Sequence, residues 1–310
     1  MIENVTFTAE SGIRLDAALL MRFPTTTRAF AREACGAGLV LVNGRAAEKG
    51  LKLRGGEMVM VTALAEVADN RAQPNRAVRA KCVFEDEALL AFDKPAGIPV
   101  QPIDRREMET LVNGVVARWP EVAEVGDHPL MAGALHRIDA DTSGLVLVAR
   151  TQPAFEAMRA QFAAQTVKKT YLALVEGAIA AGGTLENDLV HDPTLPYCRM
   201  IDISRLRVSP SRALKPLHAV TQFKPVGFTR RGMEELTLLE VTIYTGVTHQ
   251  IRAQLALAGM HIVNDRLYGA FAVEDQVGHC LHAQAVEFTH PVAQAPCRIE
   301  TPWPAWAQFE

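Results

Sequence analysis

The sequence lacks the features that mark several classes of protein. No run of about 18 apolar residues occurs, so we expect no membrane-spanning helix and no membrane partner. The first residues, MIENVTFTAESG, are acidic and do not show the basic-then-apolar pattern of a signal segment, so we expect a cytoplasmic protein. Repeats, low-complexity tracts, phosphate-cradling glycine loops, metal-ligand helices and nucleophile elbows are also absent, so no single familiar motif identifies the chemistry.

Cysteine is scarce and widely spaced. The cysteines are odd in number and include no C-x-x-C pair, so we expect neither a disulfide framework nor a zinc site: Cys35, Cys82, Cys198, Cys280 and Cys297. His279, Cys280 and His282 lie close together in GHCLHA, but a metal site would need further cysteine or carboxylate ligands nearby. We therefore predict no bound metal.

A global excess of positive charge is also missing, because the net charge is -3. The distribution is uneven, however: residues 199–231 hold eight basic residues and only one acidic residue. A solvated loop would account for this segment. The alternative is a phosphate-facing surface, because local lysines and arginines displace counterions whatever the global charge.

Length and composition indicate an ordinary globular protein with two domains. The chain has 310 residues, of which 49% are hydrophobic and 22% are charged. Residues 10–64 form the first expected domain, in which apolar residues from Leu15 to Phe23 recur at helical spacing and Thr25–Thr27 can cap a second helix over TRAFAREACGAG. LVLVNGR predicts a strand that enters an Asn43–Gly44 hairpin turn, and RGGEMVMVTAL predicts another turn and strand.

The remaining chain predicts a linker over residues 65–80 and a larger domain over 81–310. We expect helices at 107–119 and 153–164 and strands at 144–149, 170–175, 236–244 and 283–288. These elements alternate without a regular βαβ rhythm. The predicted fold class is therefore α+β, with a mixed, largely antiparallel sheet flanked by helices.

Three stretches of the larger domain carry candidate chemistry, although each is weak by itself. HRIDADTSG places Asp139 before a Thr-Ser-Gly turn and an apolar strand, and VKKTYLALVEG places Tyr171 on a strand. TGVTHQIRAQLALAG places Arg252 in the first turn of a predicted helix. Such an aspartate is usually a turn residue, such a tyrosine is usually packing, and such an arginine is usually a surface charge. Residue types alone indicate no more than an enzyme that uses a carboxylate.

The same stretches resemble a known family when they are taken together. HRIDADTSGLVLVAR is similar to the signature of the RluA-type pseudouridine synthases, in which HRLD precedes a TSG turn and an apolar strand. DKPAGIPVQP, VKKTYLALVEG, THQIRAQLALAG and LHAQAVEFTHP resemble further segments of that family, in the family's order. The resemblance covers roughly residues 82–304 and implies the pseudouridine synthase fold.

The N-terminal domain resembles a second known module. RLDAALLMRFPTTTRAFAREACGAGLVLVNGR, from Arg14 to Arg45, is similar to the S-four-like RNA-binding module, a small α/β domain that commonly precedes the catalytic domain in this family. Helix capping and a hairpin turn explain the same residues structurally, and both interpretations can hold together. The resemblance implies RNA contact through Thr27, Arg28, Arg32, Asn43 and Arg45.

The resemblance implies a reaction without a cofactor or a metal: uridine in RNA becomes pseudouridine when the glycosidic bond breaks, the uracil rotates and a carbon–carbon bond forms to the same ribose. Asp139 matches the family's catalytic aspartate, which must be ionised to attack either the uracil ring or the ribose. An enclosed carboxylate needs a partner to remain charged, because desolvation raises its pKa. The match assigns that partner to Arg252, whose guanidinium can bond a carboxylate bidentately.

Other residues of the motifs are implied to contact RNA. Arg137 matches the arginine that occupies the space of the flipped base, and Tyr171 matches the tyrosine that stacks on the flipped uracil and can help proton transfer at carbon 5. Lys169, Arg205 and Arg207 are further candidates for RNA contact.

Five neighbouring residues are expected to support the site. Asp141 is expected to bond backbone amides in the DTSG turn. His136 and His249 are expected to be hydrogen-bonding supports rather than bases, and Lys94 and Pro95 to shape a loop near the site.

Three positions depart from the family pattern. Val247 stands where arginine is usual, Gln101 where histidine is common and Asn264 where glycine is common. The loss of the arginine removes an RNA contact, for which the basic segment 199–231 could compensate.

The sequence leaves three functions open. The first is an active RNA pseudouridine synthase acting as a monomer, with ribosomal RNA favoured by the two-domain layout and transfer RNA as the other substrate. The second is a non-catalytic RNA-binding protein that retains the fold. The third is a cytosolic hydrolase that uses Asp139 and Asp141 as acid and base, which would leave the N-terminal module unexplained.

Overall fold

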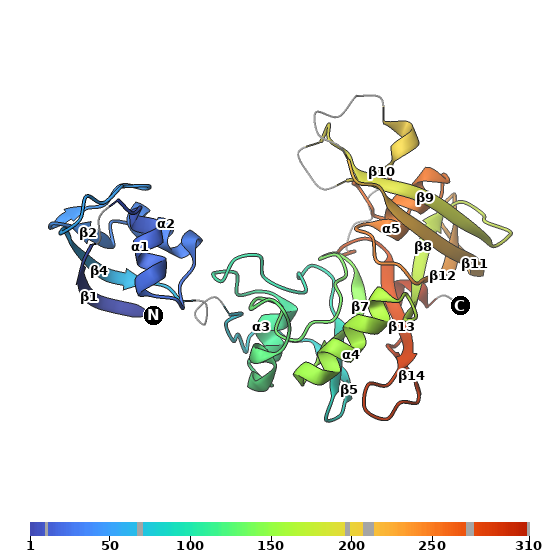
Figure 1. Ribbon diagram of the computed structural model, residues 1–310. Helices are drawn as coiled ribbons and strands as arrows, with labels where there is room; N and C mark the ends of the chain where they lie inside the picture. Colours follow the sequence, from blue (N-terminus) through green and yellow to red (C-terminus); the bar gives the residue numbers. More distant parts are fainter. Residues whose placement is uncertain (10–11, 67–70, 196–198, 207–213, 271–275, 309–310) are drawn as a thin grey trace. The chain divides into compact units, whose positions relative to one another are not determined.

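The computed structural model describes residues 1–9, 12–66, 71–195, 199–206, 214–270 and 276–308 (Figure 1). The chain divides into two compact units: residues 1–72 with 128–130 form the N-terminal unit, and residues 73–127 with 131–310 form the larger unit. Cys198 and Arg207, both named above, lie outside the described residues. Across the described ranges, no helix is long and apolar enough to cross a membrane.

The N-terminal unit packs two helices on an antiparallel sheet whose strand order is β1-β4-β2-β3. The fully buried side chains of its core include Leu15, Leu19, Ala31, Val59 and Val61, so the predicted helical and strand patterns supply the core. The elements are β1 Ile2–Thr8, α1 Leu15–Arg22, α2 Arg28–Gly36, β2 Val40–Val42, β3 Arg45–Ala46 and β4 Met58–Leu64.

Two local predictions for this unit are confirmed. Thr27 is the N-cap of α2, and its side chain accepts a hydrogen bond from the Phe30 amide at 3.2 Å. Asn43 and Gly44 join β2 to β3 with φ of 48° and 78°, because a tight hairpin turn needs left-handed residues. Strand β1 was not predicted from the sequence, since Asn4, at φ 54°, interrupts the alternation of this strand.

The larger unit is built on one sheet, and the predicted α+β architecture with a mixed, largely antiparallel sheet is confirmed. Among the described strands, β13 and β7 are the only parallel pair. The strand order is β10-β9-β11-β12-β8-β13-β7-β6-β5, with β14 pairing with β13. The bounds are β5 Lys81–Glu85, β6 Leu89–Lys94, β7 Ser143–Ala149, β8 Lys168–Glu176, β9 Gly183–His191, β10 Met200–Asp202, β11 Leu217–Arg231, β12 Glu234–Ile243, β13 Leu281–Thr289 and β14 Pro296–Glu300.

Three α-helices accompany this sheet in the ranges that the structure describes. α4 (Gln152–Ala163) contacts β7, and α5 (Gln250–Leu257) contacts β9, β10 and β11 (Figure 1). The third helix, α3 (Leu111–Val116), is shorter than the predicted range 107–119, because a capping box between Thr110 and Asn113 fixes its start. Short 3-10 turns occur at Pro120–Glu124, Ile203–Arg205 and Ala305–Ala307.

The basic segment 199–231 is largely strand in its described part. Residues 200–202 form β10 and residues 217–231 form β11, so the interpretation as a solvated loop is wrong for these ranges. Carboxylates of the neighbouring strand β12 neutralise two of its charges: Lys224 Nζ lies 2.8 Å from Glu240 Oε1, and Arg230 pairs with Glu235. The segment is therefore less basic in the fold than along the chain.

Gly144 explains how β7 begins. Its φ is +107°, and a Cβ atom at this position would lie 2.3 Å from the Ala283 carbonyl oxygen on β13. The glycine of the TSG turn therefore lets β7 approach β13 closely. This contact fixes the chain just after Asp139.

Candidate active site

The three candidate stretches meet at one cleft of the larger unit. The cleft has a volume of about 960 Å³, and its walls come from the segment before β7, from β8, from the loop before α5 and from α5 itself. The residues named from the sequence that line it are His136, Arg137, Asp139, Lys169, Tyr171, His249 and Arg252, together with Gln101 and Val247. The fold thus brings together residues that are more than a hundred positions apart in sequence.

Asp139 lies in a turn that the chain holds from two sides. The Thr142 amide donates to the Asp139 carbonyl at 3.1 Å. Lys94, fully buried, donates from Nζ to the carbonyls of Pro95 at 2.9 Å, Ile98 at 2.8 Å and Ala140 at 2.8 Å. The expectation that Lys94 and Pro95 shape a loop near the site is therefore confirmed. Burial lowers the pKa of Lys94 to about 8, against the opposing charges of Asp141 and Asp139.

Two buried histidines fix the TSG turn. His279 Nε2 lies 2.7 Å from Thr142 Oγ1, and His282 Nδ1 lies 2.8 Å from Ser143 Oγ. Asp141 is exposed and accepts no hydrogen bond from the described residues, so the prediction that its side chain bonds the amides of this turn is wrong. Through their contacts with Thr142 and Ser143, the two histidines of the GHCLHA stretch support the turn that presents Asp139. The described residues contain no group of three or more His, Cys, Asp or Glu side chains that could hold a metal ion.

Arg252 contacts the carboxylate of Asp139 directly. Its Nη1 donates to Asp139 Oδ2 at 2.7 Å, as the resemblance implied. Asp265 binds the other edge of the same guanidinium, with Nε to Oδ2 at 2.7 Å and Nη2 to Oδ1 at 2.8 Å. Burial by itself would lower the pKa of Arg252, but the hydrogen bonds that it donates to Asp265 and the charges of both carboxylates outweigh this effect and raise that pKa.

Asp265 is a site residue that was not predicted from the sequence. Its side chain is almost fully buried and accepts hydrogen bonds from Nε and Nη2 of Arg252, whereas Nη1 bonds Asp139. No spacing rule predicts this pair, because Asp265 follows α5 in a loop and not on the same helix face as Arg252. The sequence shows only an aspartate within the stretch NDRLYG, which does not by itself indicate a contact with Arg252.

Tyr268 and His249 enclose the same arginine. The Tyr268 ring centroid lies 5.2 Å from the Arg252 guanidinium, and its hydroxyl lies 3.2 Å from His249 Nδ1 and accepts from the Met200 amide at 2.9 Å. His249 Nε2 is 3.7 Å from Asp139 Oδ2, and burial lowers the pKa of His249. His249 is thus a neutral neighbour of the carboxylate, which fits the expected supporting role.

Tyr171 and Lys169 lie on β8 beside this ion pair. Tyr171 is buried, and burial together with the charge of Asp139 raises the pKa of its phenol. Its hydroxyl makes no hydrogen bond to a described residue, so the group is available to a molecule in the cleft. Lys169 Nζ donates to the Thr245 carbonyl at 2.7 Å and lies 5.7 Å from the Phe162 ring, and burial lowers the pKa of Lys169 to about 8.

Arg137 and His136 also line the cleft, whereas Arg205 does not. Arg137 is exposed at the cleft. His136 accepts the Leu147 amide at 3.1 Å, and burial followed by the charge of Lys169 lowers the pKa of His136 to about 3, which confirms it as a hydrogen-bonding support. Arg205 does not line the cleft, and its Nη2 donates to the Leu257 carbonyl at 3.2 Å.

The three departures from the family pattern each have a local structural setting. Val247 packs beside Tyr268 in an apolar cluster. Gln101 Oε1 is buried and accepts no hydrogen bond from a described residue. Asn264 has φ of 66°, a conformation that favours glycine and tolerates asparagine, and its Nδ2 donates to the carbonyls of Gln276 and Gly278.

The RNA-contact candidates of the N-terminal unit are mostly exposed. Arg28 and Arg45 are exposed on α2 and β3, and Arg32 Nε lies 3.5 Å from Asp16 Oδ2. Asn43 Oδ1 accepts from the Met58 amide at 2.9 Å. Thr27 is used as a helix cap, so both its structural and its RNA-binding interpretations remain compatible with the fold.

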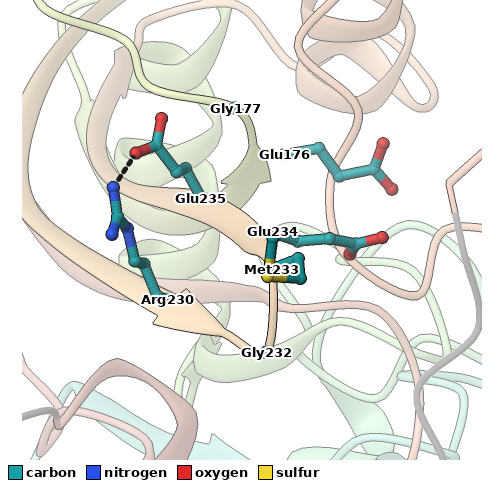
Figure 2. A pocket seen from close by; sticks show the side chains of 7 residues that line it. All are labelled: Glu176, Gly177, Arg230, Gly232, Met233, Glu234 and Glu235. Atoms are coloured by element: carbon teal, nitrogen blue, oxygen red, sulfur yellow. Dashed lines mark hydrogen bonds and ion pairs between the residues drawn. The ribbon is translucent and has the colours of Figure 1, made fainter.

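A second hollow lies where the turn between β11 and β12 meets the end of β8. The hollow has a volume of about 540 Å³. Figure 2 shows the residues that line it, which include Glu176, Glu234, Glu235 and the exposed Met233. Its one basic side chain, Arg230, pairs with Glu235. An acidic lining repels phosphate, so this hollow does not extend the cleft as an RNA surface.

Comparison with known proteins gives consistent matches. Residues 88–257 match the family described as RNA pseudouridylate synthase. Ribosomal large subunit pseudouridine synthase D of Xanthomonas campestris pv. campestris is 34% identical over 95% of this chain and 86% of that protein. The uncharacterized RNA pseudouridine synthase YlyB of Bacillus subtilis is 32% identical over 86% of this chain and 82% of that protein. Human RNA Pseudouridylate Synthase Domain Containing 1 has a similar fold, with a TM-score of 0.59 and 21% identity over 75% of this chain and 86% of that chain.

Proposed function

Because this chain belongs to the RNA pseudouridylate synthase family, it is an RNA-modifying isomerase, and we propose that it converts specific uridines of large-subunit ribosomal RNA to pseudouridine. The names of its relatives support ribosomal RNA as the substrate over transfer RNA. Neither a hydrolase nor a non-catalytic RNA-binding protein is favoured. The reaction needs no metal or cofactor, and the enzyme acts as a cytoplasmic monomer.

Asp139 is the nucleophile in this proposal. The observation that carries it is the contact of 2.7 Å between Arg252 Nη1 and Asp139 Oδ2. Because Asp265 fixes the opposite edge of the guanidinium, the positive charge is held in place before substrate arrives. A pre-placed charge keeps Asp139 ionised when bound RNA excludes water from the cleft.

The base must leave its stack before it reaches Asp139. Unstacking costs a few kcal/mol, and Arg137, exposed at the cleft, fills the vacated space with a planar guanidinium. Tyr171 stacks on the flipped uracil while the glycosidic bond breaks and the ring turns. When the bond from carbon 5 to the ribose has formed, carbon 5 loses its proton and nitrogen 1 gains one, so substrate and product are isomers.

The N-terminal unit supplies a separate RNA contact. We assign residues 10–64 as the RNA-binding domain and 81–310 as the catalytic domain. Of the predicted linker, residues 65–80, the part from residue 73 onward belongs to the larger unit. Thr27, Arg28, Arg32, Asn43 and Arg45 are the proposed contacts of that domain, and Lys169 and Arg205 are proposed contacts of the catalytic domain.

The experiment that tests this function maps pseudouridine in total RNA from cells with and without this gene. We expect defined sites in large-subunit ribosomal RNA to disappear without the gene and to return with the wild type but not with Asp139→Ala. A matched control, Asp141→Ala, changes an exposed carboxylate of the same turn and should restore the sites. Unchanged sites without the gene would overturn the proposal, and sites confined to transfer RNA would overturn its substrate.

A further inference from the structure

An arginine cluster lies on the catalytic unit outside the cleft. Arg76, Arg79 and Arg118, with Ala117, line a hollow of about 550 Å³, and this hollow shares no lining residue with the cleft. All three arginines are exposed. We call these three residues the arginine patch.

The arginine patch is unpaired in the part of the chain that the structure describes. No carboxylate lines the hollow, and none of the three guanidinium groups makes an ion pair or a hydrogen bond with a described residue. Nearby carboxylates are directed elsewhere: Glu121 Oε1 lies 2.7 Å from Arg150 Nη2, and Glu85 Oε1 accepts from Trp119 Nε1 at 2.9 Å. Three cations that gather without an acid, in a chain with a net charge of -3, indicate an anionic partner.

The fold builds this patch by fixing the segment before β5 onto α3. The Asn75 amide donates to the Asn113 carbonyl at 2.9 Å, Asn75 Nδ2 donates to the Met108 carbonyl at 2.8 Å, and Asn113 Nδ2 donates to the Gln73 carbonyl at 2.6 Å. Gly114 allows the close approach, because a Cβ atom there would lie 2.7 Å from the Val78 carbonyl oxygen. These contacts therefore hold residues 73–78, which the sequence predicts as part of a linker, against α3 and the segment before it.

Helix α3 connects the patch to the cleft. The amides of Leu111 and Val112 donate, both at 2.9 Å, to the carbonyls of Pro99 and Val100, which line the cleft. Arg118 follows the other end of the helix, and the step from Leu111 to Arg118 corresponds to about 10 Å at roughly 1.5 Å per residue. Phosphates a few nucleotides from a uridine in the cleft can reach across this distance, because a nucleic-acid strand carries a charge every ~3.4 Å of duplex axis.

We propose that Arg76, Arg79 and Arg118 bind backbone phosphates of the RNA substrate and fix its register on the catalytic unit. This inference rests on the proposed function for the identity of the substrate, but RNA binding at the patch needs no chemistry. Arginine forks suit phosphate oxygens, and contacts of this kind position RNA without reading its sequence.

The test compares the salt dependence of RNA binding by the full-length wild type and the triple variant Arg76→Gln, Arg79→Gln, Arg118→Gln, with a fluorescently labelled RNA hairpin as the probe. Each lost phosphate contact lowers the slope of log K against log salt by about 1, so we expect a decrease of about 2–3. The matched control is Lys224→Gln, Arg230→Gln, Arg298→Gln, which removes the same charge from cations already paired with carboxylates and should leave the slope nearly unchanged.

Two further measurements distinguish a failure of the patch proposal from a failure of the proposed function. Asn75→Ala retains every charge but removes the side-chain bond to Met108, so a partial loss of slope would support the held segment as the basis of the patch. In pseudouridine formation on protein-free ribosomal RNA from cells lacking the gene, the triple variant should raise KM and leave kcat unchanged.

A slope equal to that of the control triple variant would overturn the proposal and point to an acidic protein as the partner. Altered slopes combined with an inactive wild type would instead overturn the proposed function and leave the patch standing.

Discussion

At the scale of single residues, Arg252 is shared by two carboxylates with different surroundings. Asp265 is almost fully buried and bonds the guanidinium through both oxygens, whereas Asp139 reaches it through one oxygen and faces the cleft. Asp265 therefore acts as a positioning residue: it orients the charge that the nucleophile needs. A guanidinium with only one partner could rotate away from Asp139.

We expect Asp265→Asn to lower kcat by on the order of 100-fold with little change in KM, because a misplacement of about 1 Å in a catalytic group costs this much. Single-turnover rates of pseudouridine formation on protein-free ribosomal RNA would measure the effect. Glu235→Gln removes one carboxylate at the β11–β12 turn and serves as the control. An unchanged kcat for Asp265→Asn would contradict the positioning role.

Tyr171 offers a second residue-scale prediction, because its ring and its hydroxyl can be separated. The hydroxyl makes no hydrogen bond to a described residue, so it is available to a molecule bound in the cleft. Tyr171→Phe retains the stacking face and removes the hydroxyl, to which the proposed function gives a role in proton transfer at carbon 5. We expect RNA affinity to remain and kcat to fall by about 100-fold or more, the usual contribution of general acid–base catalysis. An unchanged kcat would assign the tyrosine to stacking alone.

At the scale of elements, the start of β7 depends on one glycine. Gly144 has φ of +107°, and a Cβ atom there would lie 2.3 Å from the Ala283 carbonyl oxygen, so Gly144→Ala should both strain the backbone and separate β7 from β13. Gly177→Ala is the matched control, since Gly177 has φ of +91° and open space around it. We expect Gly144→Ala to lower the free energy of unfolding by more than the roughly 1–3 kcal/mol of backbone strain alone, measured by denaturant unfolding. Equal losses for the two variants would show that the close approach to β13 has no cost.

Elements with apolar runs could be predicted from sequence, and elements without them could not. β7 and β8 are buried along nearly their whole length, so LVLVA and TYLALV predict them directly. β11 alternates exposed and partly buried residues, carries basic side chains and contains Pro225 at a register shift, and these features resemble a loop. The site could likewise be predicted only in part. Motifs supplied Asp139, Tyr171 and Arg252, but contacts between separate segments, such as Arg252 with Asp265 or His279 with Thr142, exist only in the folded chain.

At the scale of the whole molecule, the catalytic unit carries buried histidines that couple its stability to pH. Burial lowers the pKa of His279 and of His282 from the usual 6.5 to about 4 in each case. Above about pH 6.5 both rings are neutral in the folded and the unfolded chain, so the stability is fully present. As pH falls from about 6.5 toward 4, the unfolded chain binds protons that the folded chain does not, and stability is lost.

Over that window, each of these histidines should therefore lower the free energy of unfolding by about 1.4 kcal/mol for each pH unit of acidification. Tryptophan fluorescence follows the catalytic unit alone, because Trp119, Trp303 and Trp306 all belong to it. We expect its free energy of unfolding to decrease steeply between about pH 6.5 and 5, and His279→Gln to make that decrease shallower by about one histidine's share. His218→Gln, which replaces an exposed histidine on β11, is the control for the substitution itself. A slope that His279→Gln does not change would contradict the lowered pKa of this buried histidine.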